Sequence, residues 1–367
     1  MRVDIAIIGG GIAGLSCAAY LAPRASVIVI EAEPTLGYHA TGRSAAIHTE
    51  CYGAELIRRL SLASRSYFVD RDEPLGTPLP VLFVAAHDNT DAVENLYNAY
   101  HTLVPTIQRL SPEEVTALAP VILPHMTSGG ILEPGGLNLD VHGILTSFAT
   151  TARNHGCRIL TGSRVSEITR NPSGWWMRAG DRDLTAGTIV NAAGPWGDAV
   201  ATMAGIEPLG LTPFKRSAFT FDPGVPAGDW PFVVDAAEQW YMKPEGPHVL
   251  GSAASEIPQA PSDARPDEID IALGIERINE STTLAIRSIK SQWAGLRTFT
   301  PDRIPAAGYD EGGGGGFFWL VGQGGYGIHT SPALGATAAE LLLDGSVPEN
   351  VARYGVTAEM LHPGRLR

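Results

Sequence analysis

Basic runs, closely spaced cysteines and long apolar segments are all missing from this sequence. The net charge is −13 and no run of Lys and Arg occurs, so a broad nucleic-acid-binding surface is not expected. Cys17, Cys51 and Cys157 lie too far apart for a disulfide framework or a metal site, and they fit a reducing compartment. No stretch reaches the ~18 apolar residues of a membrane span, and residues 1–21 do not resemble a signal peptide. We therefore expect a cytoplasmic protein without a metal.

Strands and helices alternate at both ends of the chain. Apolar runs predict buried strands at 3–8, 27–30, 188–191 and 317–321, and periodic segments predict helices at 15–21, 54–68, 140–155 and 331–343. A β-ribbon is expected around 175–178 and Leu184, helices within 267–289, and flexible chain at the glycine run 312–316. Successive strands at 214–221, 232–234, 240–243 and 248–251 predict a separate antiparallel or mixed sheet.

A dinucleotide-binding fingerprint joins the first strand to the first helix. Gly9 permits a tight turn, Gly11 lets the backbone approach a pyrophosphate, and Gly14 lets helix and strand pack closely. The helix N-terminus then faces the phosphates. Glu31 ends the second strand, where it accepts hydrogen bonds from the adenosine ribose and argues against a 2′-phosphate. We include the neighbouring Ala13 and Ala32 among the cofactor-binding residues.

Three further segments favour FAD over NAD. The first, residues 37–46, follows Glu31 closely and contains small and hydroxyl-bearing residues that suit an extended cofactor. The second, residues 190–196, is an apolar strand that ends in small residues. The third precedes the last helix, where backbone N–H groups are suited to the negative charge that reduction places on a flavin. The residues that we assign to FAD in these segments are Thr41, Gly42, Arg43, Ser44, Ala45 and Ala46; Ala193 and Gly194; and Gly324, Gly325, Tyr326, Gly327, Ile328 and His329.

These segments resemble the D-amino-acid oxidase-like flavoenzyme superfamily over nearly the full length of the chain. Within it, segments 37–46, 215–219, 293–297 and 323–328 are most similar to bacterial D-arginine dehydrogenase-like proteins. The resemblance implies a noncovalent FAD and a Rossmann-like α/β domain with an inserted α+β substrate domain. It also implies hydride transfer from Cα to flavin N5, followed by hydrolysis of the imine to a 2-oxo acid and ammonia. We assign residues 1–75, 136–208 and 295–367 to the FAD-binding domain, and 76–135 and 209–294 to the substrate-binding domain.

The resemblance also implies roles for individual residues. Arg216 and Arg297 would hold the substrate carboxylate, Tyr241 would add a hydrogen bond, and Tyr52 would line the pocket near the amine. The loop at Gly325 would lie over the flavin, and Val165 would contact the adenine end through its backbone. Each side chain also has a structural alternative: a surface residue for Arg216, a salt bridge for Arg297, and core packing for the two tyrosines.

Two positions depart from the resemblance. Relatives that prefer cationic D-amino acids have a glutamate where this chain has Val81, so we expect neutral, apolar substrates here. His48 lies one position later than the histidine of the relatives, which puts its flavin-facing catalytic role in question.

Three functions remain open at this point. The first is a FAD-dependent D-amino-acid dehydrogenase or oxidase. The second is an amine or N-methyl or cyclic amino-acid oxidase of the sarcosine, glycine or proline type. The third is the flavin subunit of a larger oxidoreductase complex. The electron acceptor is a quinone, an electron carrier or oxygen, and no motif distinguishes between them.

Overall fold

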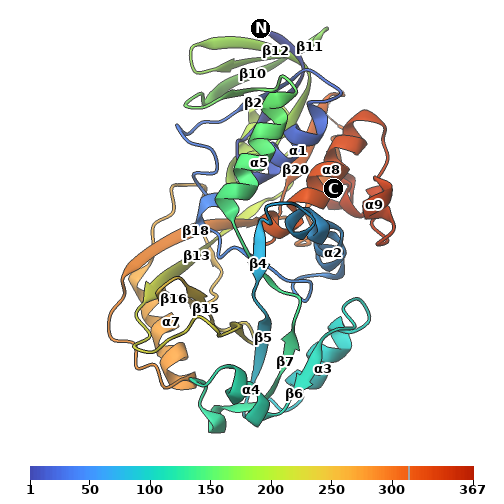
Figure 1. The fold of residues 1–367 in the computed structure, drawn as a ribbon. Coiled ribbons are helices and arrows are strands. Elements are labelled where there is room, and N and C mark those ends of the chain that lie inside the picture. Colours follow the sequence, from blue (N-terminus) through green and yellow to red (C-terminus); the bar gives the residue numbers. More distant parts are fainter. Residues whose placement is uncertain (313–314) are drawn as a thin grey trace.

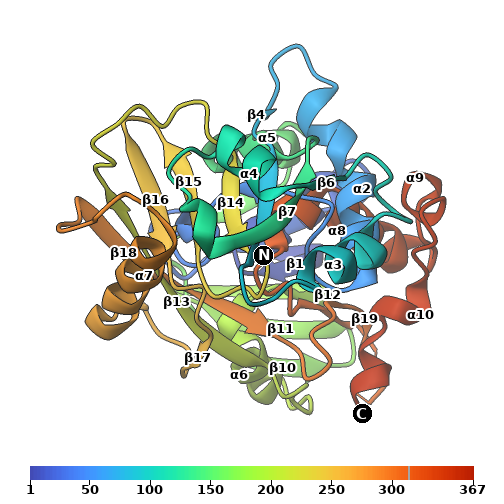
Figure 2. The ribbon, with the colours of Figure 1, turned by 90° about the horizontal axis from the view of Figure 1, so that it is seen from below.

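Three β-sheets and their surrounding helices make up the described part of the chain. The computed structural model describes residues 1–312 and 315–367. Figure 1 shows an eight-stranded sheet with its helices at one end and a nine-stranded sheet at the other, and Figure 2 gives the view from below. The flexible run predicted at 312–316 falls partly on residues 313 and 314, which lie outside the described residues.

The eight-stranded sheet contains the buried strands that the apolar runs predicted. Its order is β10-β11-β12-β1-β2-β9, with β20 beside the second half of β12 and β19 beside β20. β12 is one continuous strand where we predicted two pieces, because its first half pairs with β11 at 182–186 and its pairing with β1 takes over from Thr185 onward. The strands are β1 (Arg2–Ile8), β2 (Val27–Ile30), β9 (Arg158–Leu160), β10 (Val165–Asn171), β11 (Gly174–Ala179), β12 (Arg182–Asn191), β19 (Ala306–Tyr309) and β20 (Phe317–Val321).

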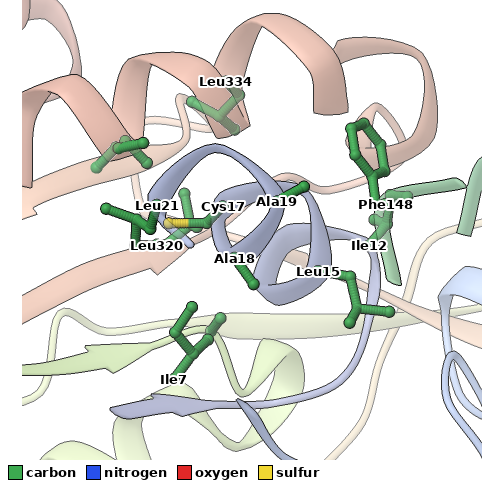
Figure 3. Packing of buried hydrophobic residues seen from close by; sticks show 14 of the residues in the cluster. Ile7, Ile12, Leu15, Cys17, Ala18, Ala19, Leu21, Phe148, Leu320 and Leu334 are labelled. Carbon is green, nitrogen blue, oxygen red and sulfur yellow. The ribbon is translucent and has the colours of Figure 1, made fainter. Parts of the chain in front are cut away.

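Helices α1 (Ile12–Leu21), α5 (Val141–Asn154) and α8 (Gly327–Leu343) lie together on one face of this sheet (Figure 1). Figure 3 shows α1 between Leu334 of α8, Phe148 of α5 and Leu320 of β20. Since α1 is apolar on nearly every side, it is buried from several directions and holds the preceding glycine turn in place. On the opposite face, the buried side chains of the central strands pack with those of β10 and β11, the strands at one end of the sheet, and with those of α6 (Gly197–Met203).

Helix α8 begins at Gly327, four residues before the start that we predicted. Pro332 lies inside the helix and has no N–H, so the carbonyl of Ile328 loses its usual backbone partner. The hydroxyl of Ser331 donates to that carbonyl at 2.8 Å instead. This local hydrogen bond satisfies the carbonyl, and the helix extends upstream of the proline to the glycine-rich loop.

The nine-stranded sheet has the order β17-β13-β16-β15-β14-β5-β7-β6, with β18 also paired to β13. All its pairs are antiparallel except β14 with β5. One face packs against α7 (Glu268–Ser281) and α4 (Pro112–Leu118). The strands are β5 (Val81–Ala86), β6 (Gln108–Leu110), β7 (Thr127–Glu133), β13 (Thr212–Phe221), β14 (Phe232–Asp235), β15 (Tyr241–Glu245), β16 (His248–Ser252), β17 (Ile257–Pro258) and β18 (Ser291–Phe299).

Smaller elements connect the two large sheets. α2 (Glu55–Val69) packs on α8, and a three-stranded sheet is formed by β3 (Ile47–His48), β8 (Leu137–Leu139) and β4 (Gly76–Pro78). α3 (Ala92–Tyr100) contacts β6 and β7, while α9 (Glu349–Ala352), α10 (Ala358–Leu361) and a 3-10 turn at Pro363–Leu366 lie at the C-terminal end. No helix among residues 1–312 and 315–367 is long and apolar enough to cross a membrane.

Two further elements, α7 and β18, also differ from what the sequence predicted. We predicted helices over 267–289, but the helix ends at Ser281 because Thr282 pairs with Ile122 and Ala285 has a φ of 47°. We did not predict β18, which pairs with β13 over nine residues. The mixed α/β fold with its Rossmann-like sheet and a second mixed sheet is as predicted, whereas the division into two domains stays a prediction.

Candidate active site

A single cavity runs from the β1–α1 turn to the nine-stranded sheet. It brings together most residues that we predicted to bind the cofactor, while Gly14, Gly42 and Tyr326 lie outside its lining. The predicted residues that line it are Gly9, Gly11, Ala13, Glu31, Ala32, Thr41, Arg43, Ser44, Ala45, Ala46, Val165, Ala193, Gly194, Gly324, Gly325, Gly327, Ile328 and His329.

The fingerprint glycines form a cradle that side chains would fill. Gly9 has a φ of 116°, and a Cβ on it would lie 2.3 Å from the carbonyl oxygen of Ala192. A Cβ on Gly14 would lie 2.0 Å from the carbonyl oxygen of Gly9, so the helix fits against the turn only with glycine there. The hydroxyl of Thr41 accepts the N–H of Ile12 at 3.0 Å and thereby stands over the first turn of α1. The residues present therefore fit a dinucleotide pyrophosphate at the helix N-terminus.

The carboxylate of Glu31 organises the other side of this cradle. Its oxygens accept the backbone N–H groups of Gly10 at 2.7 Å and Glu33 at 2.8 Å. A carboxylate has about four acceptor positions, so Glu31 keeps capacity for ribose hydroxyls. Nearby, the rings of His39 and Trp196 lie 4.7 Å apart on the cavity wall. Sequence analysis did not assign these two aromatic residues to the site because no motif marks them.

The N-terminus of α8 opens into the middle of the cavity. Gly325, Gly327 and Ile328 line it, and the first-turn N–H groups there create a positive end of the helix. Burial, together with the neighbouring His48, lowers the pKa of His329 to about 3, so this cavity-lining imidazole is neutral near pH 7. The positive potential at this end of the cavity therefore comes from the N–H groups at the start of α8 and not from a charged histidine.

Strand alternation puts the two predicted arginines side by side. Arg216 on β13 pairs with Gly295 on β18, and Phe214 pairs with Arg297, so both arginines share one face. The intervening Lys215 and Ser217 belong to the opposite face, where Lys215 binds Asp267 at the start of α7. Sequence reasoning alone did not show this convergence because β18 was not predicted.

The arginines are held by specific partners at the cavity wall. Arg297 donates to the hydroxyl of Tyr52 at 2.7 Å, and Arg216 donates to the carbonyl of Ser255 at 3.1 Å and to that of Ala254. A Cβ on Gly325 would lie 1.8 Å from Nη2 of Arg297, so this guanidinium rests directly on the backbone of the glycine loop. Both arginines line the cavity with about an eighth of their side-chain surface exposed.

An apolar wall continues the same face of the sheet. The register pairs Val81 with Phe232, Phe83 with Val234, and Val234 with Tyr241, so all five side chains point to the cavity side. Alternate residues of these strands face α4 and α7 instead. The face is thus cationic at β13 and β18 and apolar at β5 and β14.

His48 does not line the cavity. It is completely buried, with its ring 6.0 Å from that of His329 and its Nε2 3.7 Å from Glu50. Burial lowers the pKa of His48, so it is neutral near pH 7. Its catalytic role stays a prediction, as do the roles of the residues that do line the cavity.

Three carboxylates near the site were missed in the sequence. Glu133 is buried opposite Val81 and accepts the N–H of Glu50 and the hydroxyl of Thr49. Glu238 is exposed on the turn between β14 and β15 and lines the cavity. Glu256 bonds to Arg297 and Arg303. Isolated glutamates carry no sequence signal, so only the fold could bring them here.

Comparison with known proteins defines the class to which this site belongs. Residues 4–341 match the family DAO, FAD dependent oxidoreductase, and the chain therefore belongs to that family. It is an oxidoreductase, and FAD is its cofactor, bound noncovalently as is typical of the family.

Individual relatives have low sequence identity to this chain but match nearly all of its length. FAD-dependent oxidoreductase domain-containing protein 1 of Xenopus laevis is 24% identical over 94% of this chain and 80% of that protein. Glycine oxidase of Geobacillus kaustophilus (strain HTA426) is 22% identical over 97% of both chains. Mitochondrial dimethylglycine dehydrogenase of Rattus norvegicus is 24% identical over 96% of this chain, which spans 45% of that protein.

Solved structures share the fold. L-proline dehydrogenase from P. horikoshii has a TM-score of 0.84 with 23% identity, over 99% of this chain and 97% of that chain. Glycine oxidase from Geobacillus kaustophilus has a TM-score of 0.79 with 21% identity, over 93% and 94%. The substrates in these names differ from D-arginine, so the finer resemblance stays a prediction.

Proposed function

We propose that this oxidoreductase oxidises a neutral, apolar D-amino acid. The Cα hydrogen leaves as hydride and the amine loses a proton, which gives an imino acid that water hydrolyses to a 2-oxo acid and ammonia. The observation that carries the proposal is the face shared by Arg216, Arg297 and the apolar wall, on a cavity that continues to the dinucleotide cradle. FAD held in the dinucleotide cradle would supply the hydride acceptor for this oxidation.

The chain's own residues bind and orient the substrate. The two guanidinium groups are matched to a carboxylate, which they fix by charge-assisted hydrogen bonds. Tyr52 and Tyr241 line the cavity beside them, and Tyr52 already contacts Arg297. Because carboxylate and amine are held together, only one enantiomer presents its Cα hydrogen to the cofactor. The preference for the D-form rests on the resemblance found in the sequence.

The apolar wall supports a neutral substrate side chain. Val81 supplies no charge, and Glu133 does not line the cavity and has its oxygens taken by Glu50 and Thr49. A cationic side chain held against this wall away from Glu238 would lie without a counter-charge, which is unfavourable in a desolvated site. Leucine-like or methionine-like side chains fit it instead.

A second proposal is a glycine, N-methyl or cyclic amino-acid substrate. Glycine oxidase, L-proline dehydrogenase and dimethylglycine dehydrogenase are among the relatives, and each name denotes a substrate with one carboxylate. The same arginine pair suits all of these. A flavin subunit of a larger complex is the third possibility, and it has no need of a carboxylate-binding pair.

An anaerobic spectrum of the purified protein tests these functions. D-leucine or D-methionine should bleach the flavin band, whereas L-leucine and D-arginine should leave it unchanged. Bleaching by sarcosine or proline alone would move the assignment to the second proposal. A band that no amine or amino acid bleaches would contradict both. Turnover with a dye acceptor would exclude the subunit function, and quinones, electron carriers and oxygen can then be compared as acceptors.

The apolar-wall argument has its own variant test. Val81→Glu should allow D-arginine to bleach the flavin, and Val81→Gln, which has the same size without the charge, should not. If D-arginine already bleaches the wild-type protein, Glu238 is the carboxylate on the cavity wall that can pair with it, and Glu238→Gln should then abolish that bleaching.

A further inference from the structure

The arginine pair already contacts a carboxylate of the protein. Oε1 of Glu256 lies 3.3 Å from Nη1 of Arg297 and 3.7 Å from Nη2 of Arg216. Both oxygens of Glu256 also accept from Nη2 of Arg303, at 2.8 and 2.9 Å. Three guanidinium groups therefore share one internal carboxylate, and the cluster has an excess of two positive charges.

The chain around Glu256 is held firmly. The two preceding carbonyls, of Ala254 and Ser255, accept hydrogen bonds from Arg216. Ser255 in turn donates to the buried Asp270 on α7, which also accepts the N–H of Ser217 on β13. Glu256 is thus placed beside the arginines by the same segment that fixes Arg216.

Arg303 occupies the outer side of the carboxylate. Its guanidinium carbon lies 3.8 Å from the centre of the Phe299 ring, and its side chain is 45% exposed. The side chain of Glu256 is 29% exposed, between this surface arginine and the two cavity arginines. Burial alone would raise the pKa of Glu256, but Arg303, Arg297 and Arg216 outweigh it and hold the pKa below its ordinary value.

A substrate carboxylate must share these donors with Glu256. Arg297 already gives Nη1 to Glu256 and Nη2 to Tyr52. We propose that Glu256 is a specificity-determining residue, an internal competitor that weakens carboxylate binding and limits the arginine pair to ligands with one carboxylate. This inference rests on the proposed function, in which the pair binds the substrate carboxylate. Arg303 is a positioning residue that draws Glu256 towards the surface.

Ligand binding to the FAD-loaded protein tests the inference without turnover. Calorimetric titrations would use propionate, malonate and the uncharged propionamide. Glu256→Gln keeps the shape of the side chain and removes its charge, so propionate should bind about tenfold more tightly, with a larger gain for malonate and none for propionamide. Glu207→Gln is the matched control, since it removes one charge from an exposed pair with Arg367, and neither residue lines the cavity.

Unchanged or weaker propionate binding in Glu256→Gln would overturn the inference. Arg303→Gln provides a second test, because Glu256 then loses its outer partner and should compete more strongly, which weakens propionate binding. That loss should disappear in the Glu256→Gln background. A loss that persists in the double variant would show that Arg303 contacts the ligand directly and would contradict its positioning role.

Failure of the proposed function has a different signature. In that case neither the wild-type protein nor Glu256→Gln binds propionate, and Arg297→Gln changes nothing. If instead the wild-type protein binds propionate, Arg297→Gln abolishes binding and Glu256→Gln does not tighten it, only the inference about Glu256 fails.

Discussion

Gly325 supports Arg297 through its backbone, since any side chain there would occupy the space of the guanidinium. The contact joins β18 of one sheet to the loop before α8. The effect of a substitution at Gly325 can be predicted from the distance between its Cβ position and the guanidinium of Arg297, without reference to the cofactor.

Gly325→Ala should therefore mimic the loss of Arg297. Because the new Cβ would lie 1.8 Å from Nη2, the guanidinium must move, and KM for an amino-acid substrate should rise by about 10- to 100-fold, equivalent to ~1.4–2.8 kcal/mol. Steady-state kinetics with a dye acceptor measure this. Gly228→Ala is the control, because its Cβ would meet no atom within 4 Å and the residue does not line the cavity. Additive losses in the Gly325→Ala, Arg297→Gln double variant would contradict a shared cause.

Glu133 should make stability depend on pH. Burial raises its pKa from 4.5 to about 7, although the hydrogen bonds from the N–H of Glu50 and the hydroxyl of Thr49 partly offset the effect. The folded state therefore keeps a proton that the unfolded state loses, and the free energy of unfolding falls as pH rises from 4.5 to 7, by ~3 kcal/mol. Glu133→Gln removes this dependence.

Urea denaturation at pH 4.5 and at pH 8 checks that expectation. Between these values the wild-type protein should lose ~3 kcal/mol relative to Glu133→Gln. His329 has a shift of opposite sign, but it is present in both proteins and cancels in the difference. Parallel stability curves would show that Glu133 stays ionised in the folded protein.

Among the elements, α8 depends on one hydroxyl next to its proline. Ser331→Ala leaves the carbonyl of Ile328 without a partner in the buried first turns and should lower the free energy of unfolding by ~1–2 kcal/mol. In the Pro332→Ala background the backbone N–H at 332 can serve that carbonyl, so the same substitution should have a much smaller effect. Equal effects in both backgrounds, measured by denaturation, would contradict this account.

Element boundaries were predictable where apolar sequence decides them. The strands at 27–30 and 317–321 have the predicted limits. Two failures have local physical causes. The start of α8 was misplaced because Gly327 and Pro332 are typical of helix ends, and the segment of β18 has no clean alternation because Gly295 and Arg297 occupy the face that would otherwise be apolar.

At the scale of the whole molecule, the cofactor should hold the two sheets together. The cavity is lined by residues from β1, β2, β13 and β18 and from loops next to them. Removal of FAD should lower Tm by about 5 °C relative to protein with FAD at 1,000 times its Kd, which corresponds to ~4 kcal/mol. Thermal unfolding with and without added FAD measures this, and identical Tm values would show that the cradle binds no dinucleotide.

The candidate site was predictable in part. The cradle follows from Gly9, Gly11, Gly14 and Glu31, because a local β-α-β unit contains the whole signal. The arginines are 81 positions apart (297 − 216), and nothing in either segment alone indicates that they meet. The resemblance supplied that expectation, and Glu256 was absent from it because its role depends on three long-range contacts.

The alternation of β5 and β14 also bears on how such proteins diversify. Positions 81, 83, 232 and 234 can change the shape of the apolar wall while the arginines and the dinucleotide cradle, which belong to other strands, keep their contacts. Natural variation and laboratory libraries confined to these four positions can therefore explore new amines without rebuilding the redox centre. The scaffold separates the choice of what is oxidised from the apparatus that oxidises it.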